Sequence, residues 1–145
     1  MPYHRMSADE IHAFLSGEPA RPAVLGTTRE DGRPHVAPIW FVVDDDGSIL
    51  FTTGEGTVKG RNLRRAEYGV VSVDDDAPPF SFVTLEGPVS ISEDLDEVRH
   101  WAGIIGGRYM GAARADEYRR RNGVPGELLV RLTPTKTVSA RDLAD

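Results

Sequence analysis

The sequence predicts a mainly β fold: a small barrel of six antiparallel strands with helical decoration. Six short segments rich in apolar and β-branched residues follow one another along the chain, and such runs are typical of strands. Asp31-Gly32 and Asp46-Gly47 separate the first three, and an Asp-Gly pair supplies the positive φ that tight hairpins need. Two helical patterns lie between the fifth and sixth strands, which fits a barrel with added helices.

The six strands are expected at residues 23–28, 33–43, 48–53, 68–73, 80–92 and 127–133, with residues 137–140 as an extension of the last. Pro34 and Pro38 cannot donate ladder hydrogen bonds, so they place the second strand at an edge or a bulge. Gly87-Pro88 interrupts the alternation of the fifth strand and predicts a bulge there.

Helix signals lie near the N-terminus and between the last two expected strands. Ser7 and Glu10 have the spacing of a capping box and predict a helix that begins there and ends near residue 15. An apolar stripe from Leu95 predicts a second helix that ends at Gly106-Gly107. A third is expected over residues 113–122, before Gly123.

Length and composition exclude several classes of function. A length of 145 residues fits one domain, residues 1–145. The net charge of −6 argues against a nucleic-acid partner, because such binding depends on clustered positive charge. No apolar run reaches the ~20 residues of a membrane span, and the N-terminus lacks a signal core, so we expect a cytoplasmic protein. The absence of cysteine and the spacing of the four histidines predict no metal site.

The most informative segment is residues 50–63, LFTTGEGTVKGRNL. An apolar strand end leads through Thr52 and Thr53 into a glycine-containing turn, and a basic helix follows. Helix N-termini leave N–H groups unpaired and carry partial positive charge, so anions bind there. Hydroxyls, glycines that permit close backbone approach and Lys59 complete a phosphate-binding pattern. The segment therefore predicts the site of a phosphorylated cofactor, against the alternative of a solvated helix face.

Other phosphate-binding and catalytic motifs are missing. Gly54 and Gly56 begin a Rossmann fingerprint, but Lys59 occupies the position of its third glycine. The chain has no Walker A Gly-Lys-Ser/Thr and no Gly-x-Ser-x-Gly elbow. Nothing in the sequence indicates hydrolysis.

Three stretches together carry a resemblance to a known family: residues 27–36 (TTREDGRPHV), residues 38–41 (PIWF) and residues 50–63. The chain resembles the FMN-binding split β-barrel proteins related to pyridoxamine 5'-phosphate oxidase. Within them it is most similar to the actinobacterial oxidoreductases that use the deazaflavin coenzyme F420. The similarity covers about residues 23–132 and includes Arg108-Tyr109-x-Gly111.

The resemblance implies a homodimer that binds its cofactor in a groove between the subunits. Thr52 and Thr53 match strand-end positions near the phosphate and tail, Thr57 and Lys59 match phosphate-binding positions, and Asn62 lies behind them. Val58 and Arg61 belong to the same segment. The strand beside the ring is matched by Val36, Pro38, Ile39 and Trp40. Trp101 and Tyr109 are candidates to cap the ring from the partner subunit; for Trp101 the alternative is core packing.

Two departures favour coenzyme F420 over FMN. FMN oxidases of this group carry an arginine directly before the lysine, where this chain has Val58, and another near Ala37. Each charged hydrogen bond lost to a terminal phosphate costs ~1.5–3 kcal/mol. A deazaflavin has a phosphodiester and an acidic tail instead, which suits the spread of Lys59, Arg61, Arg64 and Arg65.

The resemblance thus implies hydride transfer between coenzyme F420 and an electron-poor small-molecule substrate. The cofactor supplies the chemistry, and no side chain is assigned as catalytic. His35, Tyr109 or solvent are the candidate proton donors, and for His35 the alternative is an edge-strand histidine facing water. Three other possibilities stay open: an oxidase or reductase that uses FMN, a non-catalytic protein that binds a cofactor or tetrapyrrole, and a dimeric scaffold whose groove is vestigial.

Overall fold

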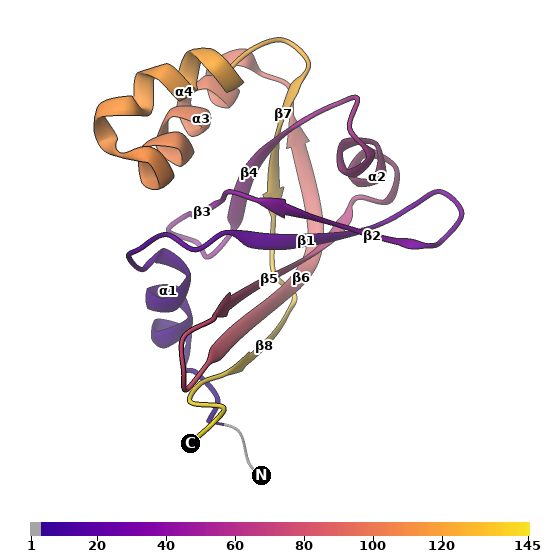
Figure 1. Cartoon of the computed structure of the whole chain (residues 1–145). Coiled ribbons are helices and arrows are strands. Elements are labelled where there is room, and N and C mark those ends of the chain that lie inside the picture. Colours follow the sequence, from indigo (N-terminus) through magenta and orange to yellow (C-terminus); the bar gives the residue numbers. More distant parts are fainter. Residues whose placement is uncertain (1–3) are drawn as a thin grey trace.

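The computed structural model describes residues 4–145, and within them eight strands form one antiparallel sheet that curls into a half-barrel (Figure 1). The elements are α1 Ala8–Ser16, β1 Ala23–Thr28, β2 Pro34–Ile39, β3 Val42–Val43, β4 Ile49–Gly54, α2 Val58–Ala66, β5 Tyr68–Asp75, β6 Ser81–Ser92, α3 Leu95–Met110, the 3₁₀ helix η1 Ala112–Arg114, α4 Ala115–Asn122, β7 Glu127–Leu132 and β8 Lys136–Ala140. The strand order is β2-β1-β5-β6-β7-β4-β3, and β8 pairs with β6. The predicted mainly β fold with helices is confirmed.

The expected number of six strands is wrong, because the second expected strand divides in two. The division falls at Trp40 and Phe41, between β2 and β3. The amide of Phe41 donates to the Tyr109 hydroxyl at 3.3 Å, and Arg108 donates to the Phe41 carbonyl at 2.6 Å. Side chains of α3 therefore satisfy the backbone of Phe41 in place of a neighbouring strand. Residues 136–140 supply the eighth strand, which pairs with β6 separately from β7.

Strand β2 lies at one end of the strand order, as its prolines predicted. The bulge expected at Gly87-Pro88 is absent, because the ladder with β5 continues through Gly69↔Gly87 and Tyr68↔Pro88. The glycine is needed for another reason. A Cβ added at Gly87 would lie 2.0 Å from the carbonyl oxygen of Thr133, where the chain crosses from β7 to β8.

Helix α3 continues past Gly106-Gly107 to Met110, so the predicted end is wrong. Gly106 serves packing: a Cβ there would lie 2.2 Å from the Cβ of Tyr118, on α4. In Figure 1, α3 and α4 lie together at one end of the sheet. No helix within residues 4–145 is long and apolar enough to cross a membrane.

Two apolar clusters pack on opposite faces of the curled sheet. Inside the barrel, side chains such as Leu25, Phe51 and Leu63 are fully buried. On the other face, Leu50 and Leu129 pack against Val98 and Ile105 of α3. The alternation of side chains along β4 and β7 thus gives the sheet one face toward the barrel and one toward α3.

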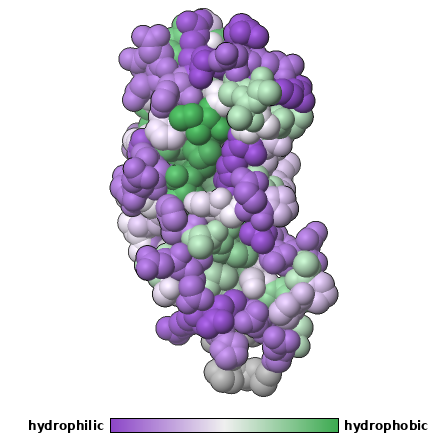
Figure 2. All heavy atoms as spheres, turned by 90° about the vertical axis from the view of Figure 1, so that its left-hand side faces the viewer, coloured by the Kyte–Doolittle hydropathy of each residue, from purple (hydrophilic) through white to green (hydrophobic). Residues whose placement is uncertain are grey.

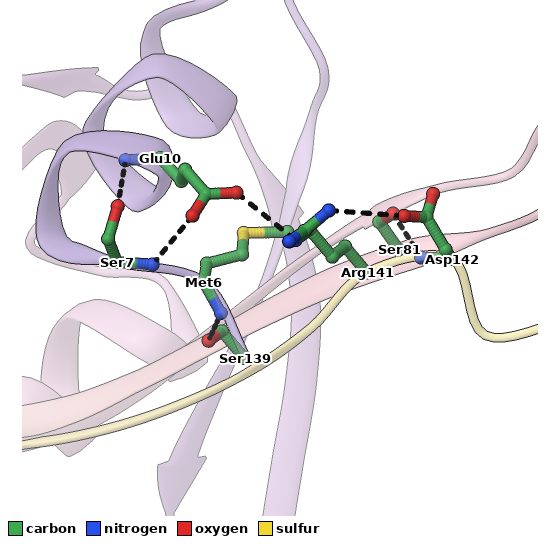
Figure 3. A network of polar contacts seen from close by, with 7 residues as sticks. All are labelled: Met6, Ser7, Glu10, Ser81, Ser139, Arg141 and Asp142. Carbon is green, nitrogen blue, oxygen red and sulfur yellow. Dashed lines mark hydrogen bonds and ion pairs between the residues drawn. The ribbon is translucent and has the colours of Figure 1, made fainter. Parts of the chain in front are cut away.

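The N-terminal helix is fastened to the end of the chain by polar contacts (Figure 3). Ser7 and Glu10 form the predicted capping box of α1. The Glu10 carboxylate also pairs with Arg141 at 3.1 Å, and the Met6 amide donates to the Ser139 hydroxyl at 3.0 Å. These contacts hold α1 beside β8, so both termini of the described chain lie at the end of the sheet opposite α3 and α4 (Figure 1).

Candidate functional site

The turn between β4 and α2 is closed by the hydroxyl of Thr57. This hydroxyl accepts from the Gly60 amide at 3.0 Å, which caps α2, and donates to the Gly54 carbonyl at 2.7 Å. Gly60 is required there, since a Cβ would lie 2.3 Å from the Gly54 oxygen. The Thr57 proton is therefore used within the turn, so Thr57 serves the site by shaping it.

The first turn of α2 keeps groups that suit an anion. The amides of Val58 and Lys59 make no backbone hydrogen bond within residues 4–145. The half-buried Lys59 side chain forms no ion pair within the same residues. Unpaired N–H groups, the positive end of the helix and a free ammonium together favour a phosphate group. The residues present therefore fit a phosphorylated cofactor.

Lys59 opens onto a groove of about 330 Å³. The groove is lined by Pro22, Pro38, Ile39, Trp40, Thr52, Lys59, Ile105 and Asn122. Five of the predicted site residues, from β2, β4, α2 and the β2–β3 connection, meet in it. Proline, isoleucine and tryptophan provide apolar walls, and Lys59 and Thr52 provide polar groups, as expected of a small-molecule site.

Trp40, which lines the groove, is held in place by Tyr109 of the same chain. The ring of Tyr109 stacks on Trp40 with centroids 5.0 Å apart and planes inclined by 3°. The Tyr109 hydroxyl donates to the Arg21 carbonyl at 2.7 Å and accepts from Phe41. Burial raises the pKa of Tyr109, so its hydroxyl keeps its proton at neutral pH. Tyr109 thus fixes the orientation of Trp40, and its proton is engaged with a carbonyl.

Other predicted residues lie on a different side of α2 from Lys59. Val58, Arg61 and Asn62 line a second hollow of about 490 Å³, with Arg29, Glu30, Asp31, Arg33 and Arg65. The predicted basic cluster is divided accordingly. Arg61 and Arg65 border this hollow, whereas Arg64 pairs with Glu93 at 2.7 Å and faces neither.

Besides Thr57 and Tyr109, four predicted residues line neither hollow. Thr53 is 4% exposed and faces the barrel interior, while Val36 is 66% exposed on the outer face of β2. Trp101 lines a separate hollow of about 290 Å³ with Val42, Val43 and Ile104, among others. Figure 2 looks onto the side where α1, α3 and α4 lie and shows an apolar strip bordered by hydrophilic residues. His35 does not line the groove; it is half-buried on the edge strand β2, and its Nδ1 is buried without a partner in the described chain.

With this geometry established, similarity to known proteins identifies the family. Residues 7–139 match the family model described as pyridoxamine 5'-phosphate oxidase. The chain belongs to the pyridoxamine 5'-phosphate oxidase family. A curated member, the F420H(2)-dependent biliverdin reductase of Mycobacterium tuberculosis, is 31% identical over 140 residues, covering 95% of this chain and 91% of the relative.

Solved structures of the family share the fold. A conserved hypothetical protein from Mycobacterium tuberculosis superposes with a TM-score of 0.78 at 27% identity, covering 97% of this chain and 89% of the other. An F420 reductase superposes with a TM-score of 0.69 at 22% identity, covering 88% and 94%, and at that identity the likeness shows the fold alone.

In this member of the family, the groove also includes three residues that the sequence did not predict. Pro22, Ile105 and Asn122 come from the α1–β1 connection, α3 and the end of α4, and no local pattern marks them. Glu127, the first residue of β7, does not line the groove but pairs with Gly54 at the turn before α2. Period-two alternation places Glu127 on the same sheet face as Leu129, the face toward α3, and this alternation is the sequence signal for its position.

Proposed function

We propose that this protein is an F420-dependent oxidoreductase that transfers a hydride between the deazaflavin coenzyme and an electron-poor small-molecule substrate. The observation that carries the proposal is the groove that joins Thr52, the ring of Trp40 held by Tyr109, and Lys59, which forms no ion pair within residues 4–145. Lys59 would hold the phosphodiester, and Pro38, Ile39 and Trp40 would lie along the ring. The named relative, an F420H(2)-dependent reductase, supports the same assignment.

The choice of coenzyme F420 over FMN rests on charge at the start of α2. A terminal phosphate carries up to two negative charges and is best held by an arginine fork beside the lysine. The residue before Lys59 is the apolar Val58, whereas Arg61 and Arg65 border the second hollow. This spread of positive charge suits a phosphodiester with an acidic tail.

The bound deazaflavin would supply the hydride, and the protein would supply orientation and exclusion of water. Trp40 and Ile39 would shield the reacting ring, and Tyr109 would hold Trp40 in place. Since the Tyr109 proton is held by the Arg21 carbonyl, we assign the accompanying proton to solvent.

We further propose that the protein acts as a cytoplasmic homodimer whose second copy closes the groove. Support comes from the outer face of the sheet, where Val24, Val36 and Val138 are 44%, 66% and 46% exposed. Cross-strand pairing places these valines on one face, through the pairs Gly26↔Val36, Val24↔Ser72, Ser72↔Thr84 and Thr84↔Val138. An exposed apolar sheet face of this kind is typical of a surface covered by another chain.

The deciding experiment is a titration of the full-length protein with coenzyme F420 and, separately, with FMN. We expect F420 to bind more tightly, and Lys59→Met to weaken it by a factor of ~10–100, since a charged hydrogen bond contributes ~1.5–3 kcal/mol. The chain has one other lysine, the exposed Lys136 of β8, so Lys136→Met is the matched control and should bind normally.

The outcome also separates the alternatives. FMN binding without F420 binding would replace the proposal with an FMN-dependent enzyme. Whichever coenzyme binds is next reduced and tested against a panel of electron-poor acceptors that includes biliverdin, the substrate named for the relative. Tight binding with no oxidation of the coenzyme by any acceptor would indicate a non-catalytic binding protein.

A further inference from the structure

Glu127 carries a buried oxygen for which the fold supplies no donor. Its Oε2 is inaccessible and has no hydrogen-bond partner within residues 4–145. A buried polar atom without a partner costs ~1–3 kcal/mol, and more when it is charged. Such an atom therefore calls for a structural or functional explanation.

The position of Glu127 connects this oxygen to the anion-binding turn. Glu127 pairs with Gly54, the last residue of β4, and its Oε2 lies 3.7 Å from the position that a Cβ on Gly54 would occupy. The methyl group of Thr57, the cap of α2, lies 3.4 Å from that same position. The carboxyl group thus packs against the turn from which Lys59 extends.

Lys59 is the charged group that acts on this carboxyl. Burial raises the pKa of Glu127, and the positive charge of Lys59 partly opposes that rise. No ion pair joins the two side chains. The other nearby carboxylate, Glu55, lies in the same turn and pairs with Arg64 at 3.7 Å. Thr52 and Leu129, on the adjoining strands, and Asn122 of α4 carry no charge.

We propose that Glu127 is a positioning residue that acts through Lys59 and links anion binding to proton uptake. As a carboxylate it attracts Lys59 and repels an incoming phosphate. As a neutral carboxylic acid, Glu127 no longer competes with the anion for the charge of Lys59. The inference rests on the proposed function, since it names a regulation of the same coenzyme site.

The direction of the pH dependence follows from which protonation state of Glu127 a bound anion favours. An anion near Lys59 raises the free energy of the Glu127 carboxylate, so binding is accompanied by uptake of a proton. Coenzyme affinity therefore falls as pH rises through the pKa of Glu127. A purely structural glutamate would show no such coupling.

The main test measures the dissociation constant of coenzyme F420 from pH 4.5 to 8.5 for wild type and Glu127→Gln. Comparison at each pH cancels titration of the coenzyme itself. We expect the ratio of the wild-type constant to the variant constant to rise at least about fivefold from the lowest to the highest pH, because the variant lacks the charge that repels the anion. Glu55→Gln, which removes the neighbouring carboxylate, should follow wild type. Parallel curves for wild type and Glu127→Gln would overturn the inference.

A second measurement needs no coenzyme. In the ¹³C NMR titration of full-length protein, the Glu127 carboxyl should show a pKa above the ordinary glutamate value of ~4.3. The pKa should rise further in Lys59→Met and on addition of sulfate, a dianion throughout this pH range. An ordinary value that ignores both changes would overturn the inference. Should wild type bind no F420 or FMN, the proposed function fails, and this titration decides the inference separately.

Discussion

Tyr109 stacks on Trp40 of the same chain with nearly parallel rings, and its hydroxyl bridges Arg21 and Phe41. The contact joins α3 to the interruption between β2 and β3. Trp40 is 37% exposed and contributes to the groove wall, so its orientation is fixed before any ligand arrives. Such pre-organisation lowers the cost of binding a planar ring.

Trp40→Leu should therefore weaken F420 binding by a factor of about 2–13, since aromatic stacking contributes ~0.5–1.5 kcal/mol beyond buried area. Isothermal titration calorimetry gives the constant directly. Trp101→Leu replaces the chain's other tryptophan, which lines a separate hollow, and should change affinity less than twofold. An equal loss in both variants would show that a partner subunit brings Trp101 to the coenzyme.

Val58 is the position at which coenzyme choice can be altered. It is 38% exposed at the start of α2, directly before Lys59. Val58→Arg would add a forked donor beside the lysine, and we expect FMN affinity to rise about tenfold or more, since charged hydrogen bonds contribute ~1.5–3 kcal/mol. Val58→Leu controls for size and should leave FMN affinity unchanged. If FMN binds Val58→Arg no better than Val58→Leu, phosphate recognition lies elsewhere.

The buried side chain of Asn62 joins α2 to β1. It is 4% exposed, its Nδ2 donates to the Thr27 hydroxyl at 3.1 Å, and its Oδ1 accepts from Arg65 at 2.9 Å. Asn62→Ala should lower the free energy of unfolding by about 2–3 kcal/mol, because buried partners lose their hydrogen bonds. Urea denaturation measures this loss. A double-mutant cycle with Thr27→Val should give coupling of at least ~0.5 kcal/mol, and strict additivity would contradict the contact.

Local signals predicted most of the fold. The Asp-Gly turns, the capping box at Ser7 and the β-rich runs correspond to observed elements. The division at Phe41 could not be predicted in this way, because its cause lies in side chains 67 and 68 residues away. The extent of α3 was misjudged for a similar reason, since Gly106 is small to admit Tyr118.

The groove residues likewise divide into those that local sequence predicts and those that tertiary packing brings to the groove. The local phosphate-binding pattern predicts Thr52 and Lys59, the family resemblance predicts Pro38, Ile39 and Trp40, and all five meet in one groove. Ile105 and Asn122 reach the groove only through the packing of α3 and α4 against the sheet. Thr53 and Thr52 are adjacent in sequence, but the pleat directs Thr53 into the barrel, so motif position alone did not separate their roles.

The exposed valines of the outer sheet face lead to a test of assembly. A glutamate at Val36 would place a charge in the proposed contact twice, once from each copy, and burying an unpaired charge is costly. We expect Val36→Glu to weaken the dimer at least about a hundredfold, measured by sedimentation velocity across a concentration series. Val124→Glu is the matched control, because Val124 is 39% exposed but lies in the α4–β7 turn.

The same variant shows whether the groove depends on the second copy. If the partner closes the groove, Val36→Glu should lose F420 affinity in step with dimer dissociation, although Val36 itself does not line the groove. Affinity that stays constant while the dimer dissociates would mean that Lys59, Thr52 and Trp40 suffice within one chain. A wild-type protein that sediments as a monomer at all concentrations would contradict the dimer, and the valine face would then need another occupant.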